Sequence, residues 1–336
     1  VTTYIRQQYV SCRKLSFPFK ERAKIHKSLA FELEDEIPLS IEKSLYEAKI
    51  LQLHEKTSDV LAMACVSDEV KKTIDIMNRG HIDPDVITAE LTALANLYET
   101  WSKPPEVEKN QAEESFPGAR LVVRVGHSKT FVGLIHKDQL VWGRSILWGV
   151  SSVIQGIAES FSVPYLTAFE MMPEKAFILL NPGEGSDDQV KMSETVAKAM
   201  EPLLHALRLT TMLIQSEHRV SIEAIDLLGK SSRIKNIEAH LTQKLEIPTN
   251  LSNPLLAHSP EPIKGQEHLK ENFQMALGLA IEGLKRPINP PVNFRQLELA
   301  KKNQSFEKFL EKWSHTGKLL AIAYVAYLIY GFSMDS

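Results

Sequence analysis

The order of apolar and polar residues predicts a run of strands and a helix in the middle of the chain. Residues 121–125 and 130–135 are rich in β-branched and other apolar side chains, and they flank the turn-forming segment Gly126-His127-Ser128-Lys129. A third such run follows a polar turn at 136–139. Runs of this kind joined by tight turns are typical of hairpin strands. Helical spacing then resumes over 151–161, with Val153, Ile154, Ile157, Ala158 and Phe161 on one face.

The segments ahead of this hairpin also have regular patterns. A helix is predicted over 20–33, and the continuous apolar run at 60–66 indicates a buried strand. Ser67 begins a helix with acidic residues in its first turn, as the helix dipole favours. A further helix is predicted to begin at Asp83-Pro84, because proline is tolerated in the first helical turn. Its apolar side would consist of Val86, Ala89, Leu91, Leu94 and Leu97.

Beyond the hairpin the pattern alternates between strands and helices. It predicts strands over 176–180 and 222–228, and helices from Ser193, over 234–245 and over 269–284. Such alternation is typical of an α/β protein. Residues 102–118 contain three prolines and no periodicity, and we interpret them as a linker between two halves.

The last part of the chain has a different character. Residues 301–313 form a basic amphipathic pattern, which indicates a helix on a membrane surface or against a partner. Residues 319–332 carry no charge, so they could be a buried core helix or a membrane span. Apolar residues on every side and lysines at the N-terminal flank favour a span, with the preceding chain in the cytosol.

Composition limits the classes of function. The chain has 336 residues, 43% of them hydrophobic, which is enough for two domains with their own cores. A net charge of −3 provides no general attraction to nucleic acid, so none is expected as a partner. Two cysteines are too few for a disulfide framework or a thiolate metal site. The chain begins with valine, which leaves open a fragment or an alternative start.

Candidate chemistry gathers around the hairpin. In nucleotide-binding proteins of the actin and sugar-kinase type, such a hairpin has an acidic residue two positions before a glycine, where it holds a metal-bound water. Here the glycine is Gly126 and the acid's position holds Arg124. Arginine stays protonated, so it can neither bind a cation nor act as a base. The alternative interpretation is an ordinary β-hairpin with a polar turn.

Two other positions, which contact phosphate and nucleoside in proteins of the actin type, also differ in this chain. The first glycine of the chain is Gly80, so nothing before it could form a glycine-built phosphate loop. Where related proteins have a glycine pair against adenosine, this chain has Gly229-Lys230. The lysine side chain would obstruct the base, although a single glycine ending a strand is also common in α/β domains.

The motifs together resemble the GspL/PilM family, the actin-like cytoplasmic proteins of bacterial type II secretion and type IV pilus machines, most closely type II secretion protein GspL. The motifs that carry the resemblance are Leu15-Ser16-Phe17-Pro18-Phe19-Lys20, Phe31-Glu32-Leu33-Glu34, Ile37-Pro38, Ile82-Asp83-Pro84, Leu94-Ala95-Asn96-Leu97, the Gly126 hairpin with Gly143-Arg144-Ser145-Ile146 and Gly149, Ala276-Leu277-Gly278-Leu279-Ala280 and Val292-Asn293-Phe294-Arg295.

The resemblance implies an α/β, actin-like (ribonuclease H-like) two-lobed fold with the N-terminal phosphate-loop strands missing and a C-terminal single transmembrane helix. The expected divisions are a first lobe at 1–115 with an inserted subdomain at about 15–58, a second lobe with its closing helix at 116–285, a basic amphipathic juxtamembrane segment at 286–316 and the transmembrane helix at 317–334. The absence of a periplasmic domain after the span suggests truncation.

The resemblance implies a non-catalytic scaffold in the bacterial inner membrane, with its globular part cytoplasmic. Its expected partners are a GspE-type secretion ATPase, platform proteins of the GspM and GspF type and membrane lipid, and a homodimer is left open. The alternative is a PilM-like switch of a type IV pilus platform, in which ATP is held by Gly126, Ser128, Lys129, Gly149 and Gly229. We expect no metal and no required cofactor. Enzymatic chemistry is not expected, because paired acids, metal-ligand spacing and a nucleophile elbow are all missing.

Overall fold

The computed structural model describes residues 1–34, 36–37, 39–99, 118–137, 139–181, 183, 185–229, 234–252, 267–284 and 291–301. The contacts group Val1–Phe294 into one compact unit and Arg295–Ser336 into another. Within the described part of the second unit there is one short 3-10 helix, η5 at Leu297–Leu299. The remaining elements all belong to the first unit.

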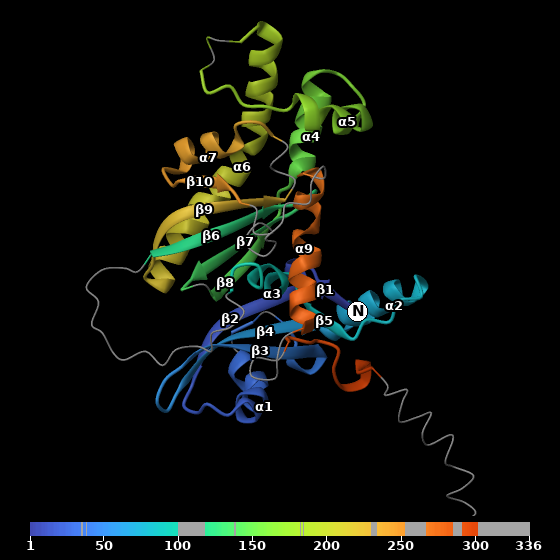
Figure 1. Cartoon of the computed structure of the whole chain (residues 1–336), viewed down its shortest axis with the longest axis vertical. Helices are drawn as coiled ribbons and strands as arrows, with labels where there is room; N and C mark the ends of the chain where they lie inside the picture. The colour runs from blue at the N-terminus through green and yellow to red at the C-terminus, as the bar shows by residue number, and fades with distance from the viewer. Residues whose placement is uncertain are drawn as a thin grey trace, which may run out of the picture. The chain divides into compact units, whose positions relative to one another are not determined.

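A five-stranded sheet forms the core of the second lobe (Figure 1). Its strands, in the order β10-β9-β6-β7-β8, are β6 Gly118–Val125, β7 Thr130–His136, β8 Gln139–Ile146, β9 Ser221–Gly229 and β10 Thr249–Leu251. β6, β7 and β8 are successive antiparallel neighbours, whereas β9 and β10 run parallel to β6. The predicted three-strand run and the strand at 222–228 are therefore confirmed.

Helices cover one face of this sheet. They are α4 Val150–Ser160, α5 Tyr165–Lys175, α6 Asp187–His218 and α7 Ile237–Leu245. Leu121, Val123 and Val125 of β6 join Ile154 of α4 and Leu203 of α6 in one buried core. Because side chains alternate along a strand, Arg120, Val122 and Arg124 lie on the opposite face. That face therefore carries two arginines.

The first lobe contains two smaller sheets. β1 Thr2–Ile5 pairs in parallel with β5 Val86–Ala89. β2 Val10–Phe17, β4 Ser58–Val66 and β3 Ser44–Leu53 form an antiparallel sheet in that order. The first lobe also contains three α-helices and two short 3-10 helices among its described residues. They are η1 Gln7–Tyr9, α1 Arg22–Leu33, η2 Ile41–Lys43, α2 Ser67–Arg79 and α3 Glu90–Ala95. The side chains of Ile25, Leu29 and Leu33 pack α1 onto the three-stranded sheet.

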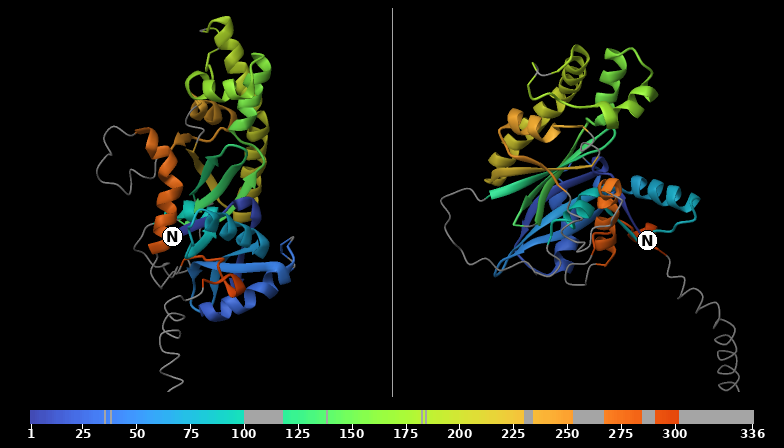
Figure 2. Two further views of the ribbon diagram at one scale, coloured as in Figure 1. Left: turned by 90° about the vertical axis from the view of Figure 1, so that its right-hand side faces the viewer. Right: turned by 45° about the horizontal axis from the view of Figure 1, so that its top comes forward.

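Helix α9, Glu267–Leu284, runs past both lobes (Figures 1 and 2). A β-carbon on Gly278 would lie 1.9 Å from the Ala93 carbonyl oxygen, so α9 and α3 touch backbone to backbone. Asn96 strengthens the contact by donating to the Gly278 carbonyl at 3.0 Å. The small size of Gly278 therefore allows this close packing.

Two predicted elements are wrong. Residues Val86–Ala89 form strand β5 rather than the first turns of a helix begun at Asp83-Pro84, and α3 starts only at Glu90. Pairing with β1, far away in the sequence, decides this segment. Residues 176–180 make a single bridge from Phe177 to Lys235 instead of a strand. The segment before them is helix α5.

Several expectations lie outside the described residues. They concern most of the linker at 102–118, Lys230, most of the basic segment at 286–316 and the whole span at 317–334. In the part that the structure describes, no helix combines the length and the apolar character that crossing a bilayer requires. The proposed lobe boundaries stay predictions.

Candidate functional site

Gly229, predicted to lie near adenosine, ends β9 beside the start of the hairpin turn. It pairs with Val125, the residue before Gly126, in the parallel ladder between β9 and β6. Its φ is +82°, and a β-carbon would lie 2.7 Å from the Val125 carbonyl oxygen. Any other residue would be strained there. Gly229 is thus required by the sheet itself.

Gly149 connects the same turn to helix α4. A β-carbon on it would lie 2.4 Å from the His127 carbonyl oxygen and 2.6 Å from the Ser128 nitrogen. The Gly126 N–H closes the turn by donating to the Lys129 carbonyl at 2.9 Å. The structure therefore brings the five predicted residues, Gly126, Ser128, Lys129, Gly149 and Gly229, to one place at the carboxyl ends of β6 and β9. Nucleotide binding by them stays a prediction.

The N-terminus of α4 is occupied by backbone atoms. Val150 donates its N–H to the Gly126 carbonyl at 3.1 Å, and Ser151 donates to the His127 carbonyl at 2.8 Å. Ser152 donates to the Gly149 carbonyl at 3.0 Å. An anion bound at a helix N-terminus needs such N–H groups to point at it. Here two turn carbonyls accept the first two hydrogen bonds, and the N-cap residue Gly149 accepts the third.

Arg124 extends from β6 to the other lobe. Its Nη1 donates to Glu90 Oε1, at the start of α3, over 2.9 Å. The side chains are 27% and 11% exposed, so the ion pair is largely shielded from water. The other oxygen, Oε2 of Glu90, accepts the Gln7 N–H at 3.1 Å. Arg124 therefore links the second lobe to two segments of the first.

The aliphatic part of the Arg124 side chain also borders Gly229, the predicted nucleoside position. A β-carbon on Gly229 would lie 3.3 Å from Arg124 Cγ. The sequence predicted the importance of Arg124 but missed Glu90, which it placed inside a longer helix. No local signal marks Glu90, because its partners Gln7 and Arg124 come from distant parts of the chain.

A second ion pair lies on the same sheet face, between β6 and β9. Arg120 Nη2 donates to Asp226 Oδ1 on β9 at 2.5 Å. Burial raises the pKa of Asp226, and Arg120 opposes that shift. Burial, followed by the nearby charge of Asp226, also raises the pKa of Tyr98 above its usual value. Asp226 is 1% exposed, so its carboxylate is part of a packed inter-strand contact and is closed to solvent.

The chemistry that this cleft can perform follows from these pairs. Glu90 and Asp226 each form an ion pair with an arginine, so both carboxylates are already engaged in contacts within the protein. Among the described residues, no three His, Cys, Asp or Glu side chains are placed to hold a metal ion. The described groups are arranged to join the lobes.

The order of the five-stranded sheet and the helices on one of its faces are those of the actin-like fold. A sequence model described as type IV pilus assembly protein PilM matches residues 10–284. The chain belongs to this family, and the resemblance to GspL/PilM proteins is confirmed. No curated protein sequence matches it.

One solved structure has the same fold, and two others are similar to a lesser degree. The PilM-PilN type IV pilus biogenesis complex superposes with a TM-score of 0.67 at 19% identity, covering 85% of this chain and 80% of that chain. The cytoplasmic domain of EpsL, an inner membrane component of the type II secretion system of Vibrio cholerae, has a TM-score of 0.30 at 13% identity, covering 48% and 52%. The ethanolamine utilization protein EutJ from Carboxydothermus hydrogenoformans has a TM-score of 0.41 at 10% identity, covering 64% and 61%.

Proposed function

We propose that this protein is a non-catalytic scaffold of a type II secretion or type IV pilus assembly platform. Its globular part would lie on the cytoplasmic side of the bacterial inner membrane and dock a GspE-type secretion ATPase to platform proteins. Family membership supports the setting. Among solved structures, the similar PilM is held in a complex with PilN, so a PilN-type protein joins GspM- and GspF-type proteins as a candidate partner.

The observation that carries the non-catalytic role is the Arg124–Glu90 ion pair. Phosphoryl transfer from ATP needs a metal ion and groups that stabilise it. A permanent cation in place of the acid disfavours a bound metal ion by charge repulsion. The hydrogen bonds from the α4 N-terminus to the turn carbonyls add to this, because they take up donors that a phosphate would use.

A direct binding experiment tests the scaffold. The full chain is mixed with the cognate secretion ATPase, and separately with a PilN- or GspM-type cytoplasmic segment, and each mixture is analysed by sedimentation at low and moderate salt. We expect association that does not change when Mg-ATP is added. Failure of every mixture to associate at low salt would contradict the proposal.

The second candidate is a PilM-like nucleotide switch, favoured by the convergence of Gly126, Ser128, Lys129, Gly149 and Gly229. Titration calorimetry with Mg-ATP separates it from the scaffold, since micromolar binding would favour the switch. Gly229→Ala should then abolish the binding, because its β-carbon overlaps the Val125 carbonyl. Gly183→Ala is the matched control, since its β-carbon would meet nothing within 4 Å.

A further inference from the structure

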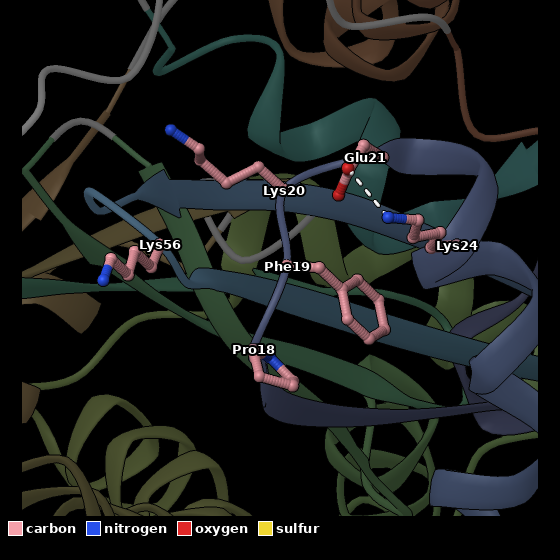
Figure 3. Close-up of a pocket in the computed structure, with 6 residues that line it drawn as sticks. All are labelled: Pro18, Phe19, Lys20, Glu21, Lys24 and Lys56. Carbon is pink, nitrogen blue, oxygen red and sulfur yellow. Dashed lines mark hydrogen bonds and ion pairs between the residues drawn. The ribbon is translucent and has the colours of Figure 1, made fainter.

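A solvent-open hollow of about 570 Å³ lies where β2 leads into α1 (Figure 3). Residues Pro18 to Lys24 contribute most of its lining, and Lys56 reaches it from the hairpin that joins β3 to β4. The full lining consists of Pro18, Phe19, Lys20, Glu21, Lys24 and Lys56. The volume is in the range of hollows that accommodate a few side chains.

The apolar part of the hollow is held in place. Phe19 packs against Phe17 with ring centroids 5.5 Å apart and planes tilted by 39°. Its carbonyl accepts a hydrogen bond from Ser58 Oγ on β4 at 2.8 Å. Phe19 is nevertheless only half-buried, and the adjacent Pro18 is exposed. A fixed and partly exposed ring can accept an apolar side chain without losing further conformational freedom.

The charged part of the hollow is positive. Lys24 Nζ lies 2.9 Å from Glu21 Oε1, and this hydrogen bond lowers the pKa of Glu21, so the two charges balance. Lys20 and Lys56 contact no carboxylate within the described residues, and they extend away from the Glu21–Lys24 pair (Figure 3). The exposed Glu55, next to Lys56 in sequence, is outside the lining. Two positive charges therefore remain uncompensated beside Phe19.

Neighbouring acids do not neutralise this charge, because they have other partners. Asp59 accepts from Ser16 Oγ at 2.5 Å and lies 3.5 Å from Lys14 Nζ. The whole chain has a net charge of −3, whereas the lining of the hollow is positively charged.

We propose that this hollow docks an acidic segment of a partner protein that carries one apolar side chain, with carboxylates on Lys20 and Lys56 and the apolar group on Phe19. The inference deepens the scaffold function and rests on it for its biological role. It names the chemistry of one partner contact, which the scaffold function leaves open.

A peptide segment fits the hollow better than a lipid headgroup. Membrane attraction contributes about 1 kcal/mol per basic residue near the surface and needs several on one accessible face. Here two uncompensated lysines border a concave surface with an aromatic wall, and Lys24 is already paired. Both the shape and the exposed ring suit a chain segment with a side chain to insert.

The test uses the full chain and a fluorescein-labelled peptide in which glutamates flank a single phenylalanine. Fluorescence anisotropy measures its affinity for the wild-type protein and for the double variant Lys20→Glu/Lys56→Glu. Loss of two ion pairs and their replacement by repulsion should weaken binding at least about tenfold. The matched control is Lys71→Glu/Lys198→Glu, which changes the net charge equally at exposed helical lysines far from the hollow in sequence.

Two further arms examine the two halves of the hollow. Replacing the peptide's phenylalanine by alanine should weaken binding to the wild type several-fold. This measurement uses only the wild-type protein, so it does not depend on the folding of a variant. Vesicles of phosphatidylcholine with phosphatidylserine should sediment no more wild-type protein than Lys20→Glu/Lys56→Glu protein. Equal peptide binding by both charge-reversal variants, or lysine-dependent vesicle binding without peptide binding, would overturn the inference.

The outcome is distinguishable from the fate of the scaffold proposal. If the peptide does not bind while the protein still sediments with its ATPase or platform partner, only the hollow is overturned. If the peptide binds as expected but no platform protein associates at low salt, the hollow stands as a docking site and the scaffold function falls.

Discussion

At the residue scale, the charge of Arg124 decides how the cleft is interpreted. The spacing of the hairpin motif was enough to place this arginine where related nucleotide-binding proteins have an acid. Its partner could not be found in the same way. Glu90 and Gln7 are close to each other in space but distant in sequence.

The ion pair leads to a prediction about stability. Arg124→Ala should lower the free energy of unfolding by about 3 kcal/mol, because the Glu90 carboxylate would remain largely buried without its cation. Adding Glu90→Gln to Arg124→Ala should recover part of the loss. Urea unfolding of the two single variants and the double variant measures this coupling.

The surface pair Lys72 and Glu69 on α2 is the control for that cycle. The Lys72 side chain is 66% exposed, so water screens this pair and its coupling should be small. A coupling between Arg124 and Glu90 as small as that of the surface pair would mean that the inter-lobe contact does not hold the cleft.

A buried histidine makes stability depend on pH. His240 on α7 is 5% exposed, and burial followed by the charge of Lys244 lowers its pKa in the folded protein. The unfolded chain therefore binds the proton first as pH falls. Stability should decline from about pH 6.5 downward, until the pH falls below the lowered folded-state pKa.

Urea titrations between pH 7.5 and 5 check this dependence. The free energy of unfolding of His240→Gln should change less steeply with pH than that of the wild type. The matched control is His26→Gln, which replaces a histidine on the exposed side of α1. Identical slopes in the wild type and His240→Gln would argue against the assigned role of burial.

At the scale of elements, backbone contact between α9 and α3 holds the lobes closely. Gly278→Ala should destabilise the protein by at least about 2 kcal/mol, because the new methyl would lie 1.9 Å from the Ala93 carbonyl oxygen. The comparison is Gly156→Ala in α4, where the β-carbon would contact Ala199 Cβ at an ordinary 3.5 Å. This second change should be neutral or stabilise by up to about 1 kcal/mol through helix propensity.

Urea midpoints of the two glycine variants provide the measurement. Equal midpoints would mean that α9 can shift away from α3 at little cost in free energy. The close packing of the two helices would then contribute little to stability. The sequence had indicated small residues in this helix, but which glycine touches a backbone is decided by the position of α3.

At the scale of the whole molecule, the contacts of Val1–Phe294 predict one cooperative unfolding transition. Helix α9 contacts both lobes, and Arg124 links β6 to α3. Cys12 and Cys65 are buried in the three-stranded sheet, and Trp148 is buried in the second lobe. Thiol reactivity and tryptophan fluorescence thus report on different lobes.

Both probes should give the same urea midpoint. The experiment uses a Trp101→Phe/Trp313→Phe background, so that fluorescence comes from Trp142 and Trp148. Thiols that become reactive at clearly lower urea than the fluorescence change would show that the first lobe unfolds by itself. Destabilising Gly278→Ala should then widen the gap between the probes.

Local pattern predicted the elements whose environment is regular along the chain. The strands β6, β7, β8 and β9 and helix α4 follow from their side-chain periodicity, because each buries one face in the same core. The prediction was wrong for Val86–Ala89, because so short and mostly apolar a run is compatible with either a helix or a strand. Pairing with β1 makes this segment a strand. Residues 176–180 failed because only Phe177 found a partner.

The sequence by itself determined the family, the order of the central elements and the cation at the acid's position, because these depend on residue type and spacing. Tertiary structure alone decided that Arg124 pairs with Glu90, that the α4 N-terminus donates to the hairpin turn, and that Lys20 and Lys56 border one hollow. Each of these joins segments distant along the chain. Electrostatic and hydrogen-bond partners depend on distances in space, which local periodicity does not contain.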